Sequence, residues 1–301
     1  MTSIDVDQVK AIGGVLNDPS RPLKERFRAL FTLRNIGGST AQECIKQCFK
    51  DPSALLKHEL AYCLGQMQDH AAIPTLVSVL RDNSQEPMVR HEAGEALGAL
   101  AAPDIRAILE EFQNDPVVEV AETCALALDR LSWVEKHKED GRSENPYLSV
   151  DPTPPSEEKD VAKLRAVLLN ENESLFNRYR AMFALRNLRS TDAVLALTDG
   201  LKAGSALFKH EVAFVLGQLQ DPVSVPALLE SLADKSENEM VRHECAEALG
   251  AIATEECNSG LEKHLHDEKR VVSESCIIAL DMCEYENSPE FQYANTLLSV
   301  K

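Results

Sequence analysis

Apolar residues recur at intervals of three and four positions along most of this chain, which is the pattern of amphipathic α-helices. Asp-Pro, Glu-Pro and Gly steps interrupt the pattern, as expected for turns between helices. Four segments, 22–31, 54–65, 87–98 and 116–127, are versions of one helix spaced by roughly 30 residues, and shorter apolar segments such as 71–80 lie between them. The pattern therefore predicts helical hairpins that stack, because each hairpin leaves an apolar face that only its neighbours can cover.

The same pattern is present twice in the chain. Residues 9–129 match a second stretch 152 residues further along without a gap, as in 26–34 (RFRALFTLR) and 178–186 (RYRAMFALR). Gapless agreement of this length indicates two homologous halves. We therefore expect an all-α solenoid of eight helical-hairpin repeats, arranged as two halves of four repeats, 1–135 and 161–301, that are related by a pseudo-twofold axis.

A different kind of sequence joins the two halves. Residues 136–160 contain four prolines and many charges, with almost no apolar periodicity. We interpret this segment as an exposed, largely irregular linker. Its length would let the two halves face each other.

Four His-Glu dipeptides occupy equivalent positions in the repeats. They are His58-Glu59, His91-Glu92, His210-Glu211 and His243-Glu244. The two dipeptides of each half are 33 residues apart, and the two halves are offset by 152 residues. The outer repeats carry Phe27, Val120, Tyr179 and Val272 at the histidine position, so the helix itself does not require histidine there. A duplication should drift unless something holds all eight residues, which favours a shared chemical role over solvated or hydrogen-bonded pairs that were merely copied.

Histidine and glutamate together form a ligand set for a transition metal. Equivalent helices of a stacked solenoid lie about 8–10 Å apart, so His58 and His91 project from neighbouring helices on one face and can meet at one ion. A carboxylate added to two histidines gives the ligand set of non-haem iron oxygenases, with positions left open for oxygen or substrate. Two such sites brought together by the pseudo-twofold axis predict a dinuclear centre. The thiolate-free ligands favour iron, although zinc or manganese hydrolases use similar ligands.

The composition indicates which kind of partner the protein can bind and in which cellular compartment it can reside. A net charge of −18 argues against nucleic-acid binding through a basic surface and favours a cationic partner. No apolar run approaches the ~20 residues needed to span a membrane, and the N-terminus lacks the apolar core of a signal peptide. The eight cysteines form no CxxC pair and most fall on apolar helical positions, which fits a reduced cytoplasmic protein rather than a disulfide framework.

The chain resembles the deoxyhypusine hydroxylases, a family of HEAT-repeat di-iron monooxygenases, over nearly its whole length. The resemblance rests on the segments 56–68, 86–98, 210–218 and 240–250, which hold the four His-Glu dipeptides, and on the linker motif 146–152 (PYLSVDP). It implies a HEAT-like fold for the helical hairpins. It also implies hydroxylation of the deoxyhypusine side chain of translation initiation factor 5A to hypusine, with molecular oxygen and two electrons from a reductant.

The resemblance implies two Fe²⁺ ions per chain, one in each half, and this di-iron centre would itself be the catalytic group. The implied ligands are His58, His91 and Glu92 in one half and His210, His243 and Glu244 in the other. Glu59 and Glu211 would either ligate iron or hold the charged amines of the substrate. We expect a cytoplasmic monomer that binds neither nucleic acid nor membrane.

Three other functions stay open at this point. A non-catalytic HEAT-repeat scaffold that binds a basic protein would explain the repeats and the charge, but not the His-Glu dipeptides. A protein similar to the bilin lyases would share the repeats without the paired dipeptides. A dinuclear metal hydrolase would use similar ligands, and metal identity and oxygen dependence separate it from an oxygenase.

Overall fold

The computed structural model describes residues 4–137 and 145–298. Within these two ranges it contains sixteen α-helices, four short 3-10 helices and no β-strand. The α-helices pair in chain order into eight hairpins. The prediction of an all-α solenoid of eight repeats in two halves is therefore confirmed.

The first half comprises eight α-helices and two 3-10 turns. They are α1 (Val6–Asn17), α2 (Leu23–Ile36), α3 (Gly38–Gln47), η1 (Cys48–Lys50), α4 (Ala54–Gln66), η2 (His70–Ala72), α5 (Ile73–Arg81), α6 (Pro87–Leu100), α7 (Ile105–Phe112) and α8 (Val118–Lys136). The second half repeats this order. Its elements are α9 (Val161–Leu169), α10 (Leu175–Leu188), α11 (Thr191–Gly200), α12 (Ala206–Leu219), η3 (Pro222–Ser224), α13 (Val225–Ala233), α14 (Glu239–Ile252), α15 (Glu255–Glu262), α16 (Arg270–Glu286) and η4 (Thr296–Leu298).

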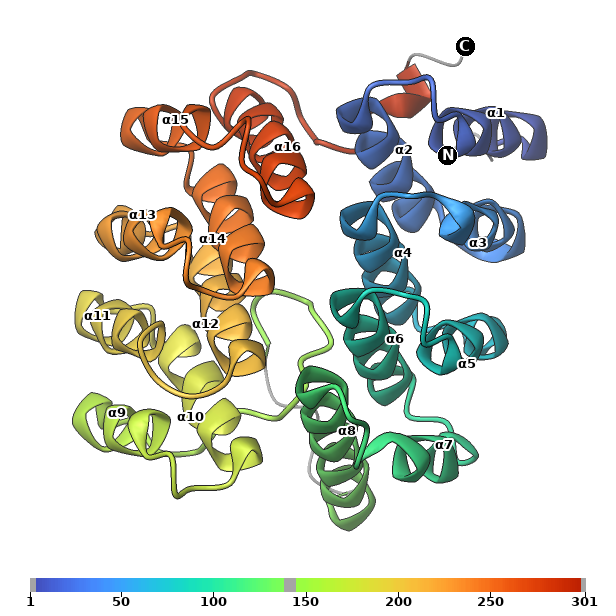
Figure 1. The fold of residues 1–301 in the computed structure, drawn as a ribbon. Coiled ribbons are helices and arrows are strands. Elements are labelled where there is room, and N and C mark those ends of the chain that lie inside the picture. The colour runs from blue at the N-terminus through green and yellow to red at the C-terminus, as the bar shows by residue number, and fades with distance from the viewer. Residues whose placement is uncertain (1–3, 138–144, 299–301) are drawn as a thin grey trace.

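The hairpins stack as two columns whose inner helices face each other (Figure 1). In each column the even-numbered helices form the inner layer and the odd-numbered helices form the outer layer. Successive inner helices pack on one another, α4 on α6 and α6 on α8 in one column, and α12 on α14 and α14 on α16 in the other. The columns run in opposite directions, so α2 meets α16 at one end and α8 meets α10 at the other.

Small residues let the inner helices approach one another closely. A Cβ atom on Gly65 of α4 would lie 2.9 Å from the Cα atom of Ala96 on α6. A Cβ atom on Gly250 of α14 would lie 2.7 Å from the Cα atom of Ala279 on α16. Neither distance leaves room for a side chain, so glycine is required at both positions. The close approach holds neighbouring inner helices at a spacing that lets their side chains reach a common point.

Buried arginines join consecutive repeats. The Nε atom of Arg90 donates to the carbonyl oxygen of Leu80 (2.9 Å), and its other nitrogens donate to both carboxylate oxygens of Asp115 (3.1 and 2.6 Å). Arg242 makes the same contacts with the carbonyl group ten residues before it and with Asp267. The hydrogen bond from Arg242 lowers the pKa of Asp267 to about 2. These bidentate pairs fix the position of each repeat against the next.

The linker is irregular but only partly exposed. No helix or strand is present between residues 145 and 160, whereas Pro152 and Thr153 are buried. The carboxylate of Asp151 accepts hydrogen bonds of 3.0 and 2.7 Å from Arg186 of α10, which is itself fully buried. The expectation of an exposed linker is therefore wrong for these residues, because a buried guanidinium group draws the carboxylate inward. The part of the predicted linker at 138–144 lies outside the described residues.

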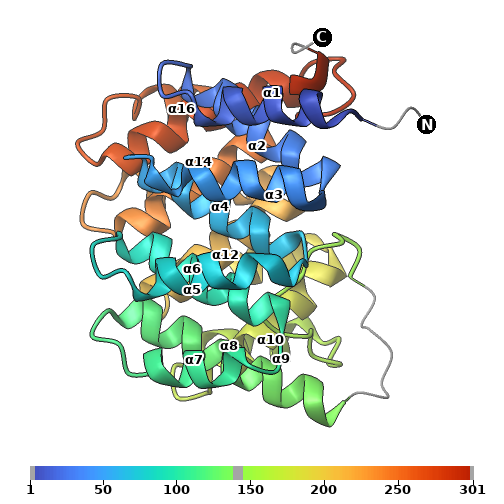
Figure 2. The ribbon, with the colours of Figure 1, turned by 90° about the vertical axis from the view of Figure 1, so that its right-hand side faces the viewer.

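Contacts at both ends close the two columns into a ring. At one end Arg28 of α2 donates to both carboxylate oxygens of Asp281 on α16 (2.8 and 3.2 Å). At the other end α8 packs against α10. Between the columns, Gln66 of α4 and Gln218 of α12, which are duplicates of one residue, both hydrogen bond to the turn at 145–151. Figure 2 shows that this turn and the C-terminal segment lie on the same side of the molecule.

The remaining features concern the cysteines and the membrane. All eight cysteines are free thiols; Cys44 is half-buried and the other seven are buried. Among the helices of residues 4–137 and 145–298, none combines the length and the apolar character that crossing a bilayer requires.

Candidate metal centre

Four histidines from four inner helices meet between the two halves. His58, His91, His210 and His243 are each the fifth residue of their helices, α4, α6, α12 and α14, and all four are buried. Their ring centroids lie 5.2 to 5.7 Å apart for five of the six pairs. The sequence predicted that the two histidines of each half meet and that the pseudo-twofold axis brings the two sites together, and the structure places all four histidines in one cluster.

Two glutamates lie against these histidines. The Oε2 atom of Glu92 is 3.3 Å from Nε2 of His58. The Oε2 atom of Glu244 is 3.2 Å from Nε2 of His210 and 4.0 Å from Nε2 of His243. In both halves the glutamate follows the histidine of one inner helix and reaches the histidine of the preceding inner helix. Adjacent repeats therefore contribute jointly to each group of ligand atoms.

The two halves group their ligand atoms differently. His58, His91 and Glu92 each offer an atom within 4.8 Å of the others, which is the ligand set expected for the first half. In the second half the compact group is His243, Glu244 and Glu247, and another group consists of His58, His210 and His243. Glu244 is thus a neighbour of both His210 and His243, as expected. In addition, Glu247 lies near His243 and Glu244, and His58 lies near the two histidines.

The cluster leaves buried polar atoms without partners. Neither ring nitrogen of His91 or of His243 makes a hydrogen bond within the described part of the chain, and Oε1 of Glu211 also lacks one there. An unpaired buried polar group costs about 1–3 kcal/mol, and ligation of a cation would remove that cost. Imidazole nitrogens and carboxylate oxygens without a thiolate suit first-row metals such as iron, manganese or zinc. The residues present therefore fit a metal centre.

The electrostatics of the cluster favour a cation. Burial raises the pKa of Glu59 and Glu211, and neighbouring carboxylates raise both pKa values further. Burial, followed by the charge of the other imidazoles, lowers the pKa of His91 and His243 well below the usual value. These two rings are consequently neutral at neutral pH, as metal ligation requires. Neutral imidazoles beside crowded carboxylates are stabilised by a metal ion or by a cationic amine.

Glu59 and Glu211, whose roles the sequence left open, have different contacts. The Oε1 atom of Glu59 is 3.2 Å from Nδ1 of His58, while Glu92 faces the other nitrogen of that ring. Burial alone would lower the pKa of His58, but the hydrogen bonds with Glu59 and Glu92 outweigh it and raise the pKa well above the usual value. Glu59 therefore contacts a histidine ring, whereas Oε1 of Glu211 is buried without a hydrogen-bond partner among the described residues, and both glutamates line the adjoining cavity.

Two further glutamates belong to the centre, and sequence reasoning missed them. Glu95 and Glu247 are duplicates of one position, four residues after His91 and His243, and so lie on the same helix faces as these histidines. The Oε1 atom of Glu247 is 3.5 Å from Nδ1 of His243. Burial, followed by neighbouring carboxylates, raises the pKa of both glutamates well above the usual value. The sequence signal that could have identified them is a His-Glu-x-x-Glu motif, which is present in both halves.

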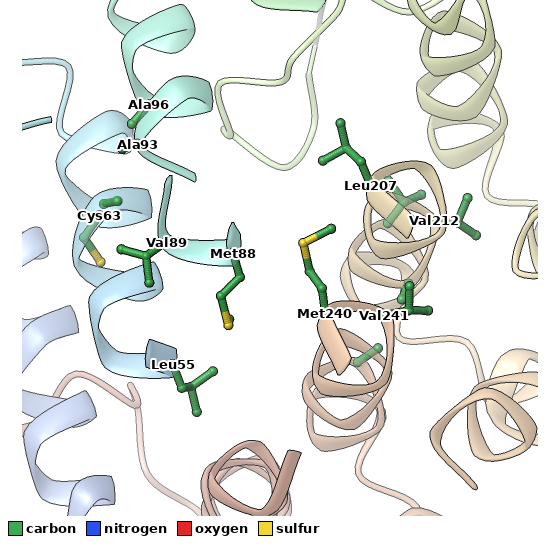
Figure 3. Packing of buried hydrophobic residues seen from close by; sticks show 14 of the residues in the cluster. Leu55, Cys63, Met88, Val89, Ala93, Ala96, Leu207, Val212, Met240 and Val241 are labelled. Atoms are coloured by element: carbon green, nitrogen blue, oxygen red, sulfur yellow. The ribbon is translucent and has the colours of Figure 1, made fainter. Parts of the chain in front are cut away.

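The cluster is sealed on one side and open on the other. The residues three positions before the histidines are apolar and buried; they are Leu55, Met88, Leu207 and Met240. Figure 3 shows Met88 and Met240 opposite one another across the gap between the halves. The residues four positions after the histidines line a cavity; they are Tyr62, Glu95, Phe214 and Glu247. The rings of Tyr62 and Phe214 approach from the two halves, with centroids 6.1 Å apart.

The cavity has a volume of about 410 Å³. Seven carboxylates line it, namely those of Glu59, Glu92, Glu95, Glu211, Glu244, Glu247 and Glu286. Phe27, Phe31, Tyr285 and Tyr293 supply aromatic walls, and Arg34 adds one guanidinium group. This size is typical of small-molecule sites. Carboxylates at one end and aromatic rings along the walls suit an extended cation with an apolar middle.

Known proteins share this sequence and this fold. A family model of HEAT repeats matches residues 196–281, and a model of the PBS lyase HEAT-like repeat matches 56–82, 89–115 and 178–203. The deoxyhypusine hydroxylase of Drosophila melanogaster is 65% identical over 295 residues, which cover 98% of this chain and 97% of the fly protein. The chain belongs to the deoxyhypusine hydroxylase family. The resemblance inferred from the His-Glu motifs is confirmed.

Other members of the family agree with this assignment. The deoxyhypusine hydroxylase of Homo sapiens is 60% identical over 290 residues, which cover 96% of both proteins. A solved structure of human deoxyhypusine hydroxylase in complex with glycerol matches with a TM-score of 0.91 at 60% identity. The match covers 93% of this chain and 97% of the human one. The ring of eight repeats described above is therefore the fold of the family.

Proposed function

We propose that this protein hydroxylates the deoxyhypusine side chain of translation initiation factor 5A to hypusine at a di-iron centre. The deoxyhypusine hydroxylase family to which the chain belongs supports this reaction. The observation that carries the proposal is the convergence of four buried histidines and six glutamates, of which two histidines and all six glutamates line a single cavity. In the overall reaction one atom of O₂ enters a C–H bond and the other leaves as water, while a reductant supplies two electrons and the solvent two protons.

We assign one iron to His58, His91 and Glu92 and the other to His210, His243 and Glu244. When bound, iron supplies the redox chemistry that activates oxygen. The lowered pKa of His91 and His243 keeps both rings neutral and able to offer a nitrogen lone pair. The buried side chains of Met88 and Met240 cover the side opposite the cavity, so water is excluded there from the reacting atoms.

The cavity fits the chemistry of the substrate side chain, which is long and carries two cationic amines at neutral pH. The net charge of −18 attracts such a cation toward the protein, and the carboxylates of the cavity orient it. We assign amine binding to Glu59 and Glu211, because both line the cavity and neither belongs to a compact group of ligand atoms. The rings of Tyr62 and Phe214 are placed to contact the methylene groups between the amines.

The first test is the metal content of the chain, measured by plasma mass spectrometry after expression with ample iron. We expect close to two irons per chain, together with transfer of one labelled oxygen atom from isotopically labelled O₂ to the substrate protein. Two zinc or manganese ions and no oxygen-dependent product would support a dinuclear hydrolase instead. A chain that binds no metal, even after anaerobic iron loading, would leave a HEAT-repeat scaffold as the better explanation.

A second test separates the roles of the two glutamates. Glu59→Ala and Glu211→Ala should weaken binding of the substrate protein more than they reduce iron content. Glu230→Ala, on the exposed face of α13, is the matched control and should change neither quantity. Loss of iron in both active-site variants would place these glutamates among the metal ligands.

We also propose that the protein is a cytoplasmic monomer. Its free cysteines suit a reducing compartment. Light scattering coupled to gel filtration measures the mass in solution, and fractionation of cells measures the location. A stable dimer or a membrane-bound fraction would contradict this part of the proposal.

A further inference from the structure

A turn of the linker, residues 145–151, lies between the two columns (Figure 1). Gln66 of α4 accepts a hydrogen bond from the main-chain nitrogen of Val150 (3.0 Å), and Gln218 of α12 donates to Oγ of Ser149 (3.4 Å). Because Gln66 and Gln218 are duplicates of one residue, both halves hold the turn from equivalent positions. Gln218 also lines the cavity, which places the turn at its edge.

Leu148 lies in this turn in an unusual conformation. Its φ of 55° is in the left-handed region, which disfavours a branched side chain, and its side chain is 90% exposed. Side-chain contacts on both sides of Leu148 hold the turn in this conformation. Arg186 donates to both oxygens of Asp151 and lies 4.7 Å from the ring of Tyr147, so the residues on both sides of Leu148 are fixed. The surrounding contacts therefore hold an apolar side chain out in solvent.

The C-terminal segment, which lies on the same side of the molecule as the turn (Figure 2), contains a second exposed apolar residue. Phe291 is 97% exposed, and the two residues that follow it, Gln292 and Tyr293, line the cavity. This segment is also fixed, because Arg28 donates to Glu290 (3.1 Å) and lies 4.7 Å from the ring of Tyr293. No other large apolar side chain of the described residues exceeds 59% exposure, so Leu148 and Phe291 stand apart from the ordinary surface.

We propose that Leu148 and Phe291 form a docking surface for the protein that carries the deoxyhypusine side chain. The inference rests on the proposed function, in which a side chain of a folded protein must enter the cavity to reach the histidines. Phe291 precedes two cavity-lining residues, and Leu148 precedes Ser149, which accepts a hydrogen bond from the cavity-lining Gln218. Both residues would therefore contact the substrate protein beside the entering side chain. The carboxylates of the cavity recognise the amines, and the docking surface recognises an apolar area beside them.

The occupant is therefore a protein with an apolar surface next to a protruding cationic side chain. Fixed apolar side chains are efficient anchors, because little conformational freedom is lost when the partner binds. A free amine or a short peptide can use the cavity without touching this surface. This difference between ligands provides the test.

The test uses the double variant L148N/F291S of the complete chain with its metals bound. Asparagine accepts the left-handed conformation at residue 148, so the turn is not put at risk. Binding is measured by titration with the deoxyhypusine form of the substrate protein and with a short peptide that contains deoxyhypusine. We expect the Kd for the protein to rise about tenfold, with the Kd for the peptide and the metal content changed less than about twofold.

The matched control is Leu195→Asn on the outer helix α11, where the side chain is 47% exposed and does not line the cavity. It should leave both Kd values unchanged. An unchanged Kd for the protein in the double variant, or an equal rise for protein and peptide, would overturn the proposal. So would a wild-type dimer that the double variant abolishes, since the occupant would then be a second copy of this chain. Wild-type chain that binds the substrate protein but does not hydroxylate it would refute the proposed reaction while leaving the docking comparison intact.

Discussion

Replacement of Glu247 by glutamine should weaken metal binding without unfolding the protein. The Oε1 atom of Glu247 is 3.5 Å from Nδ1 of His243, and the two atoms do not form a hydrogen bond in this structure. A small approach would let this carboxylate accept the Nδ1 proton when Nε2 ligates a metal. A carboxylate in this position fixes the orientation of a ligating imidazole and makes its other nitrogen more basic. Glutamine keeps the size of the side chain and an acceptor oxygen, but it removes the charge.

The size of the effect follows from the hydrogen bond that Glu247 would form with His243 in the metal-bound chain. A hydrogen bond to a charged group contributes about 1.5–3 kcal/mol, and one between neutral groups contributes about 0.5–1.5 kcal/mol. We therefore expect Glu247→Gln to lose about 1–1.5 kcal/mol of metal-binding free energy, which raises the metal Kd about tenfold. Glu247→Ala removes the acceptor altogether and should lose about 2 kcal/mol, a rise of roughly 30-fold.

Competition with a coloured chelator measures the Kd of the metal-free chain for Co²⁺ and Fe²⁺, and plasma mass spectrometry gives the number of metals per chain. The glutamine variant should still bind two metals, one of them more weakly. Glu230→Gln is the control, because this glutamate pairs with Lys202 on the surface of the outer layer. Unchanged Kd values for both metals in Glu247→Gln would refute the orienting role. A fall to one metal per chain in this variant would show that Glu247 is itself a ligand.

Three further predictions concern the centre and the fold that holds it. His91→Ala should lose bound metal while circular dichroism shows unchanged helix content, and retention of both metals would count strongly against the centre. Asp267→Asn should lower the free energy of unfolding at neutral pH. Because Arg242 lowers the pKa of Asp267 to about 2, the stability contributed by the ionised carboxylate is fully present above about pH 4 and disappears as the pH falls toward 2. Denaturant titrations should therefore show the stability of the variant converging on that of the wild type in acid. Gly250→Ala should lower the free energy of unfolding by about 1–3 kcal/mol, since its Cβ would meet the backbone of α16. Gly14→Ala has open space around it and should raise the free energy of unfolding by up to about 1 kcal/mol. Thermal unfolding that gave both variants the same sign would contradict the packing argument.

The stacking of the helical hairpins could be predicted because each repeat has a local pattern of apolar residues in its sequence. Apolar spacing of three and four residues specifies a helix, and the 152-residue offset specifies that one half copies the other. The closure of the ring has no such local signal. It depends on Arg28 and Asp281, which are 253 residues apart, and on glutamines that act only once the linker turn lies between them. Pairings between distant polar side chains leave no period in the sequence.

The centre was predictable to the extent that its residues repeat. Histidine at one helical position in two of four repeats pointed to ligands in each half, and the structure places those ligands together. That His58 of one half lies beside His243 of the other could not be predicted, because the contacts at the ends of the ring decide how the halves meet. The burial of Asp151 was also hidden, since a segment rich in proline and charge gives no sign that Arg186 binds it from a distant helix.

The ring has two junctions between its halves, and only one of them is covalent. At the second junction the C-terminal segment reaches back to the first hairpin, where the main-chain nitrogen of Thr296 donates to Oγ1 of Thr32 (3.3 Å) and η4 packs against α1 and α2. The two ends of the described chain are consequently neighbours in space (Figure 1). A circular permutation that joined these ends and began the chain at Asn145 would keep every inner helix and every histidine in its place. The molecule is thus a closed circle of repeats, and which half is translated first makes no difference to the centre that the halves enclose.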